Sequence, residues 1–196
     1  MTTDTNTTAP RFTVTLAALR KAGACYAGYN KLVRSLQGQP FTDEDEGRES
    51  YILFRHDAEI PLLDILKSNG VDDALWSLRC VSGADRDIRL FAVWCARQVE
   101  HLMQDQRSKD ALDVAERFAN GDASDEELAA AWDAALDAAR AAAGAAAWAA
   151  ALAAAGVAAG VAAWDAAWDA AWDAQTEMFK RMCLGTAPWQ QEKAVA

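Results

Sequence analysis

Apolar side chains recur at helical spacing through the first 121 residues, and short polar or glycine-containing turns separate the stretches. Spacings of three and four residues place side chains on one face of a helix. Six stretches follow this pattern: Leu16 and Leu19; Tyr26, Tyr29, Leu32, Val33 and Leu36; Leu62, Leu63, Ile65 and Leu66; Ala74, Leu75 and Leu78; Ile88, Phe91, Ala92, Cys95, Val99 and Leu102; Leu112, Ala115 and Phe118. The pattern therefore predicts an all-α fold with no convincing sheet.

Residues suited to helix ends flank these stretches. We expect Pro61 to be the first residue of a helix, and Asp72, Asp85 and Ser108 to cap the N-termini of three others. A capping box at Ser124–Glu127 opens the alanine-rich part of the chain.

Residues 39–50 form an acidic stretch that contains proline and glycine, and we expect a loop there. Tyr51–Phe54 is short and apolar and could form a strand, but no second clear strand exists to pair with it. We therefore interpret it as an extended or helical lead-in to the next helix.

Alanine dominates residues 129–174, where every fourth residue is a tryptophan, leucine, arginine or glycine and the motif AAWD recurs. Alanine favours helix, but a period of four drifts by about 40° per repeat around an α-helix. From Trp132 to Trp172 the drift is about 400°, so one straight helix cannot bury all its tryptophans against one partner. We expect a helical hairpin or a bent helix with a break at Gly144 or at Gly156–Gly160, or else a helix that crosses several partners in turn.

Aspartates that follow the repeat positions lie about 100° further round the helix, at the border with solvent. The tryptophans can dock the alanine helix onto the rest of the protein, which we favour, or they can serve as anchors for another protein. The candidate interaction surface consists of Asp133, Asp137, Trp164, Asp165, Trp168, Asp169, Trp172 and Asp173.

A membrane helix is the alternative interpretation of the middle of the repeat. Ala141–Trp164 contains no charge, and Gly156 and Gly160 match a helix-dimer spacing. Alanine is only weakly suited to the membrane, and the flanking charges are mostly acidic, so we favour a protein without a membrane span.

Composition and charge restrict the function. Hydrophobic residues make up 52% of the chain, yet the mean hydropathy is −0.12, because 28 of the 46 alanines lie in residues 129–174. The net charge is −10, and the residues from Asp122 onward include eleven acidic and four basic side chains. This balance argues against direct nucleic-acid binding and favours a basic protein partner.

No catalytic or metal-binding constellation is apparent. The four cysteines form no CxxC pair, the two histidines lie far from them in sequence, and no nucleotide-binding or hydrolase motif is present. His56 and Asp57 form an isolated HD pair without the further ligands that a metal phosphohydrolase needs. We therefore expect no enzyme activity, no metal and no cofactor. The polar N-terminus is unlike a signal peptide, so a cytoplasmic location is expected.

The composition suggests four parts. Residues 1–14 are expected to be a flexible tail, 15–121 a helical globular domain, 122–184 the repeat region, and 185–196 a second tail.

Several segments resemble a family of alanine-rich proteins found in phages, prophages and bacterial genomes, whose central part is similar to segments of immunity proteins. The segments are Lys21–Tyr29, Asp72–Arg79, Arg86–Arg97, Ala111–Gly121, Glu127–Trp132 and the AAWD repeats. The resemblance covers roughly residues 15–183 and carries over no catalytic residue. It implies an all-helical accessory protein in conflicts between phage and host or between toxin and immunity factor.

These observations predict a non-enzymatic acidic protein that neutralises another protein, as an immunity-like factor or a phage-encoded inhibitor of host defence of the anti-CRISPR type. Its partner would be a basic toxin or a subunit of a defence complex. One alternative is a self-associating structural or virion accessory protein, which would form homo-oligomers. The others are a membrane-inserted helix and an enzyme that uses the HD pair.

Overall fold

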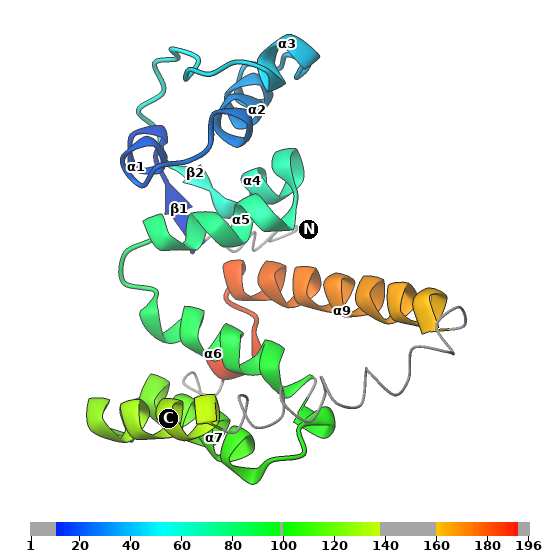
Figure 1. The fold of residues 1–196 in the computed structure, drawn as a ribbon. Coiled ribbons are helices and arrows are strands. Elements are labelled where there is room, and N and C mark those ends of the chain that lie inside the picture. Colours follow the sequence, from blue (N-terminus) through cyan, green and yellow to red (C-terminus); the bar gives the residue numbers. More distant parts are fainter. Residues whose placement is uncertain (1–10, 99, 138–159, 192–196) are drawn as a thin grey trace, which may run out of the picture. The chain divides into compact units, whose positions relative to one another are not determined.

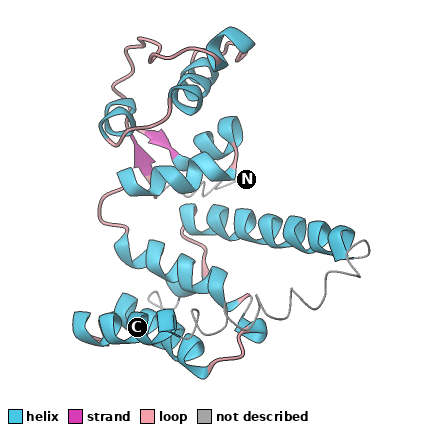
Figure 2. Cartoon of the chain, in the orientation of Figure 1, coloured by secondary structure: helices cyan, strands magenta, loops and turns pink. Residues whose placement is uncertain are grey.

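The computed structural model describes residues 11–98, 100–137 and 160–191, without the side chains of residues 102 and 160–171. Helices account for most of this part of the chain, and the described strands are two short ones (Figures 1 and 2). The prediction of an all-α fold is confirmed.

The chain divides into two compact units, Met1–Ala84 with Lys180–Ala196, and Asp85–Phe179. The first unit contains β1 (Thr13–Val14), α1 (Leu16–Lys21), α2 (Tyr26–Leu36), α3 (Asp43–Glu46), β2 (Ile60–Pro61), α4 (Leu62–Asn69), α5 (Val71–Ser77), η1 (Leu78–Cys80) and α10 (Pro188–Gln191). The second contains α6 (Asp85–Arg97), η2 (Glu100–Leu102), α7 (Gln106–Asn120) and a helix at 125–137. α9 (Gly160–Cys183) starts in the second unit and contributes its last four residues to the first. These boundaries differ from the expected division at residues 121 and 184.

A two-stranded antiparallel sheet joins β1 to β2 in the first unit, with Val14 opposite Ile60 (Figure 1). The Leu62 N–H donates to the Phe12 carbonyl oxygen at 3.1 Å, which extends the pairing into the start of α4. Phe12, Val14 and Ile60 are buried. The expectation of no convincing sheet overlooked this short pairing, because two residues are too few to give an alternating pattern. Phe12 and Val14 belong to the core, although residues 1–14 were expected to be a flexible tail.

α2 carries the fully buried side chain of Asn30, which is hydrogen-bonded to the backbone of the segment after α3. Its Nδ2 group donates to the Ser50 carbonyl oxygen at 3.0 Å, and its Oδ1 accepts from the Ile52 N–H at 2.8 Å. Residues 51–57 adopt no regular secondary structure. One buried amide thus replaces the strand pairing that Tyr51–Phe54 lacks, since buried backbone groups need a partner.

The acidic stretch at 39–50 contains a short helix, α3, where a loop was expected. The Thr42 hydroxyl accepts from the Asp45 N–H, and the Asp45 carboxylate accepts from the Thr42 N–H, so the two residues form a capping box. Arg34 of α2 donates two hydrogen bonds to the buried Asp45 carboxylate, from Nε to Oδ2 at 2.9 Å and from Nη2 to Oδ1 at 2.7 Å. This bidentate ion pair ties α3 to α2 and gives the helix a support that four residues alone lack.

Asp45 makes the stability of the first unit depend on pH. Its hydrogen bonds with Arg34 lower the pKa of the carboxyl from 3.8 to about 2. Because the folded pKa lies below the unfolded one, the ion pair stabilises the fold above about pH 4, and this contribution is lost as the pH falls toward 2. We expect the free energy of unfolding, measured in urea, to decrease over this interval.

Both Asp45→Asn and Arg34→Met should flatten this decrease, because each removes one side of the pair. A decrease of unchanged steepness in both variants would show that other carboxyls cause it.

Helix N-termini were predicted less well than helix C-termini. Gly70 precedes α5 where Asp72 was expected as the cap, and Asp85 is already the first residue of α6. The cap of α7 is Asp105, whose carboxylate accepts from the Arg107 N–H, rather than Ser108. Many polar residues can cap, so the first one before an apolar stripe is a weak signal.

Pro61 lies one residue before its predicted place, at the N-cap of α4. The glycine-containing turns expected between the helical stretches are present, and Gly23, Gly38, Gly70, Gly83 and Gly121 have positive φ there.

The buried face of α6 is shifted from the predicted stripe. Phe91 is buried as expected, but its neighbours in the core are Leu90 and Val93, whereas Ala92 is exposed. α6 ends at Arg97, and Val99 lies outside the described residues.

α6 packs against α7 through Arg97, whose guanidinium contacts three carboxylates. It lies 2.8 Å from Asp113, 2.6 Å from Glu116 and 3.1 Å from Glu100. These hydrogen bonds raise the pKa of the guanidinium. Arg86 of α6 also donates to Asn120 at the end of α7. Both ends of α6 are therefore bound to the second half of α7.

Candidate functional site

A sharp turn after α7 starts the helix at 125–137. Gly121 ends α7 in the left-handed conformation, with φ of 85°. The predicted capping box is confirmed, since the Glu127 N–H donates to the Ser124 hydroxyl at 3.2 Å and the Glu127 carboxylate accepts from the Ser124 N–H at 2.9 Å. Arg117 pairs with Glu127 at 3.4 Å. These contacts separate the first AAWD repeat from α7 as a helix of its own.

One face of this helix presents an apolar stripe to solvent. Trp132 is 70% exposed, and Leu136, one turn further along, is also exposed. With 100° per residue, Ala129, Trp132 and Leu136 lie within an arc of about 60°, together with Asp125 at the start of the helix. All four are exposed. An exposed tryptophan is a common anchor for a protein partner, and an exposed apolar stripe around it marks an interaction site.

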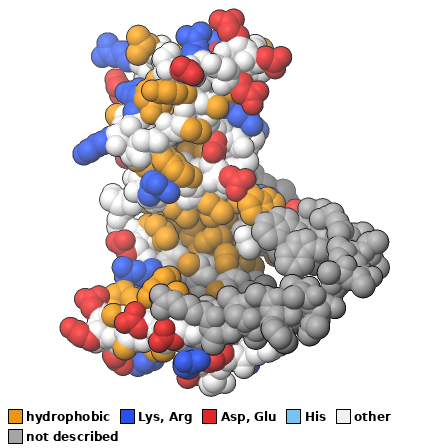
Figure 3. Space-filling model, viewed as in Figure 1, with side chains coloured by type: hydrophobic (Ala, Val, Ile, Leu, Met, Phe, Trp, Pro, Cys, Tyr) orange, Lys and Arg blue, Asp and Glu red, His pale blue; other side chains and the backbone are white. Residues whose placement is uncertain are grey.

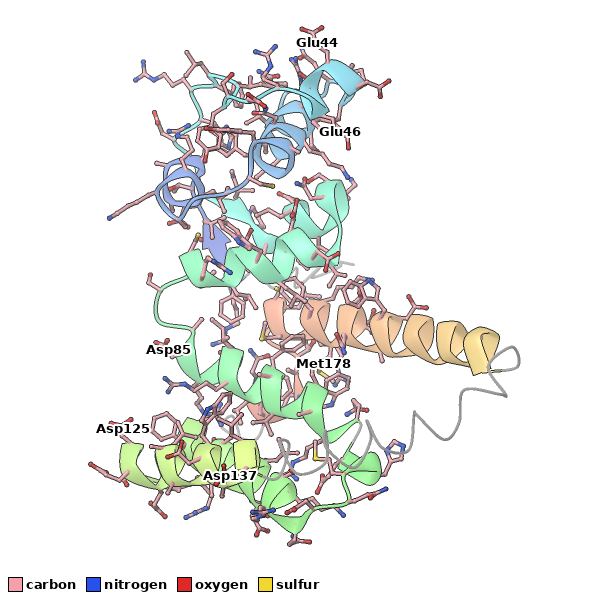
Figure 4. All side chains as sticks on the ribbon, viewed as in Figure 1. Glu44, Glu46, Asp85, Asp125, Asp137 and Met178 are labelled. Carbon is pink, nitrogen blue, oxygen red and sulfur yellow. The ribbon has the colours of Figure 1, made fainter. Side chains whose placement is uncertain are left out.

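A stripe of carboxylates runs beside the apolar stripe. Glu126, Asp133 and Asp137 are exposed and lie within an arc of about 40° on the neighbouring face. Figure 3 shows acidic side chains gathered over this helix, and Figure 4 shows Asp125 near one end of it and Asp137 near the other. We call the two stripes together the Trp132 surface; it consists of Asp125, Glu126, Ala129, Trp132, Asp133, Leu136 and Asp137.

The Trp132 surface carries a strong local negative charge. Residues 118–139 contain six acidic side chains and no lysine or arginine. The pKa of Arg107 on α7 is raised mainly by its hydrogen bond with Asp105 and further by the charge of Asp137. The charge of the surface therefore reaches neighbouring groups, and it would attract a basic side chain from a partner.

The structure places the predicted interaction residues on two helices. Asp133 and Asp137 lie on the Trp132 surface. Trp172, which is half-buried, and Asp173, which is exposed, lie on α9. The remaining four belong to α9, but their side chains are outside the described residues: Trp164, Asp165, Trp168 and Asp169.

The prediction that tryptophans dock the alanine helix fails at Trp132. Its ring points to solvent, and the side of the helix turned to the protein carries Leu128 and Ala131, which are half-buried. The predicted break at Gly144 or Gly156 lies outside the described residues, and Gly160 is the first residue of α9.

The remaining candidate chemistry belongs to the first unit. His56 stacks on the Phe54 ring at 5.7 Å, on the irregular segment after α3, and Asp57 beside it pairs with Arg55. Within residues 11–98, 100–137 and 160–191, no group of three or more acidic, histidine or cysteine side chains could hold a metal ion. Among the helices described, none is both long and apolar enough to cross a membrane. Most of the candidate span at Ala141–Trp164 lies outside the described residues.

Trp132, Ala129 and Leu136 were absent from the predicted surface, although the sequence contained a signal for them. The capping box at Ser124 and the four-residue repeat together place Trp132 and Leu136 on one face of a short helix. What sequence could not show is which side of that helix faces the protein.

Comparison with known proteins identifies no relative. No family model, no curated protein and no solved structure matches the chain. The resemblance to alanine-rich phage and bacterial proteins therefore stays a prediction, and the function has to be argued from the Trp132 surface itself.

Proposed function

We propose that this protein is a non-enzymatic binding protein that neutralises a basic protein partner through the Trp132 surface. The observation that carries the proposal is the exposed Trp132 side chain beside a stripe of three carboxylates. Tryptophan is among the residues that contribute most at interfaces, and it covers a large area with little loss of conformational entropy. The carboxylates would steer a positively charged partner and fix its orientation.

The negative charge of the Trp132 surface restricts the kind of partner that can bind to it. Two copies of this chain paired through the surface would bring Glu126, Asp133 and Asp137 of each copy together, and like charges repel. DNA and RNA would be repelled for the same reason. A partner with lysine or arginine around an apolar pocket is the chemistry that fits. An immunity-like factor that covers a basic toxin, or a phage-encoded inhibitor that covers the nucleic-acid groove of a defence protein, would need such a surface.

The first experiment identifies the partner by its place of contact. A photo-crosslinking amino acid at Ala129, beside Trp132, should capture one basic protein when the chain is expressed in its native cell. The same amino acid at Leu53, which is 95% exposed in the first unit, is the matched control and should not capture that protein. The captured protein should lose its own activity when the wild-type chain is added.

The second experiment measures the surface directly. We expect Asp133→Lys with Asp137→Lys to weaken binding of the captured partner by at least about tenfold, and Trp132→Ala to weaken it by about thirtyfold. Reversal of two exposed acidic residues on α3, Asp43→Lys with Glu44→Lys, is the control for net charge and should change the affinity little. Equal losses from both reversals would leave only a general charge effect and would contradict a specific interface. Self-association in light scattering, abolished by Trp132→Ala, would instead favour a homo-oligomer.

A further inference from the structure

The first unit contains a cavity of about 260 Å³ between α1, α2, α4 and α5. Its inner wall is apolar and is formed by Leu19, Leu32 and Ile65, which are buried. The rings of Tyr29 and Trp76 complete the wall. A largely apolar pocket with a few polar groups is the usual form of a site for a small molecule, and this partly open pocket is slightly smaller than most such sites.

One carboxylate, that of Asp73, faces this apolar space. The Asn69 side chain holds it in place, because its Nδ2 group lies 2.7 Å from Asp73 Oδ2 and 2.7 Å from the Gly28 carbonyl oxygen. Among the described residues, no lysine or arginine forms an ion pair with Asp73. A carboxylate can accept about four hydrogen bonds, so this one keeps acceptor capacity for a ligand.

Gly28 leaves the room that this arrangement requires. A Cβ atom at Gly28 would lie 2.7 Å from Asp73 Oδ2 and 3.2 Å from the Cys25 sulfur. Any side chain at this position would therefore push the carboxylate aside. Glycine here is explained by the close approach of α2 to Asp73 rather than by the backbone conformation.

The aromatic walls are fixed from outside the cavity. The Arg79 guanidinium lies 4.5 Å from the centre of the Trp76 ring, and its Nε donates to the Trp76 carbonyl oxygen. Arg20 donates to the Tyr29 hydroxyl. Rings that are held in place lose little freedom when a ligand binds, so the site is preorganised.

We propose that this cavity binds a small organic amine, an ammonium group on an apolar body, with Asp73 as the partner of the charge. At neutral pH an alkyl ammonium is protonated and donates three hydrogen bonds, which suits the remaining acceptors of the carboxylate. A neutral ligand would leave Asp73 without a counter-charge in a largely apolar space, and an anion would be repelled. This site is independent of the Trp132 surface, which belongs to the other unit.

The test uses the full chain and three probes of similar size that differ in charge: phenethylamine, 2-phenylethanol and phenylacetate. We expect phenethylamine, titrated to about 10 mM and followed by NMR, to shift the Asn69 side-chain amide and the Gly28 amide with a saturable curve. The alcohol and the acid should bind at least about tenfold more weakly. Equal binding of amine and alcohol, or the absence of saturable shifts with the amine, would overturn the proposal.

Asp73→Asn should weaken binding of the amine at least about tenfold. Asp72→Asn is the matched control, because it changes the exposed carboxylate next to Asp73.

A second readout does not depend on either variant. Cys25 is exposed at the edge of the cavity, whereas burial raises the pKa of the Cys95 thiol to about 11 and that of Cys183 to about 12. Burial also raises the pKa of the Cys80 thiol. A thiol reagent should therefore modify Cys25 first, and phenethylamine should slow that reaction; an unchanged rate would contradict occupancy of the cavity.

A lysine side chain of another protein is the other source of an ammonium group. Nα-acetyl-lysine methylamide should bind more weakly than phenethylamine, because its thin alkyl stem fills less of the aromatic wall. Tighter binding of the blocked lysine would overturn the assignment to a free amine.

Discussion

Phe179→Ala should destabilise the second unit by about 3–5 kcal/mol, the largest loss we expect from a single substitution. The Phe179 side chain has no exposed surface, and its ring meets the Phe91 ring of α6 edge to face, with centroids 6.1 Å apart. Truncation removes most of a buried aromatic side chain and leaves a cavity that a well-packed core cannot fill by itself. Chemical denaturation followed by circular dichroism measures the loss. Native-state hydrogen exchange at the amides of α6 shows whether it occurs in this unit.

Trp132→Ala is the matched control, because it removes a larger aromatic side chain from the same unit. Its ring is mostly exposed, so we expect a change within about 0.5 kcal/mol. A comparable loss for both variants would mean that Trp132 is part of the core and that the Trp132 surface is not an available interface. A small loss for Phe179→Ala would contradict its place in the core.

Asn30→Ala should destabilise the first unit by about 2–3 kcal/mol, although it removes only an amide. The cost comes from the two backbone groups that lose their partner, the Ser50 carbonyl and the Ile52 N–H. A buried polar group without a hydrogen bond costs about 1–3 kcal/mol. The irregular segment at 51–57 has no strand partner to take over, so it should also exchange its amide hydrogens faster.

Ser35→Ala, at an exposed position of the same helix, controls for changes in helix propensity and should be nearly neutral. Destabilisation by Asn30→Ala without faster exchange at Ile52 would show that the cost arises elsewhere in α2.

Much of the fold followed from local sequence. The glycine-containing turns between the helices and the stripe at Tyr29, Leu32 and Val33 were predicted correctly, because backbone freedom and helical period act within a few residues. β1 and β2 were missed, since their pairing joins residues that are 46 or more positions apart and each strand has only two residues. α3 was also missed, although its capping box of Thr42 and Asp45 is local, because four residues form a helix here only with the ion pair from Arg34, eleven positions before Asp45.

The candidate sites were harder to predict than the helices. The repeat indicated acidic residues at the border with solvent, and Asp133 and Asp137 lie there. Trp132 was expected to dock because tryptophan supplies the bulk that alanine lacks, and only the packing of the helix on Leu128 and Ala131 shows that it faces outward. The amine site could not be predicted at all, since Gly28, Asn69 and Asp73 come from three helices and none of them belongs to a motif.

The discontinuous first unit has a consequence for synthesis on the ribosome. The Arg11 N–H donates to the Cys183 carbonyl oxygen at 2.9 Å, and Cys183, Ala187 and Trp189 are buried in a unit that otherwise consists of residues up to 84. Ribosomes add roughly 5–20 residues per second, so the early residues wait several seconds for this last part of their core. Residues 85–179 emerge in the meantime and can fold as a continuous unit. The first unit is thus the first to be translated and the last to be completed, and during that wait it is the part of the nascent chain most open to chaperones.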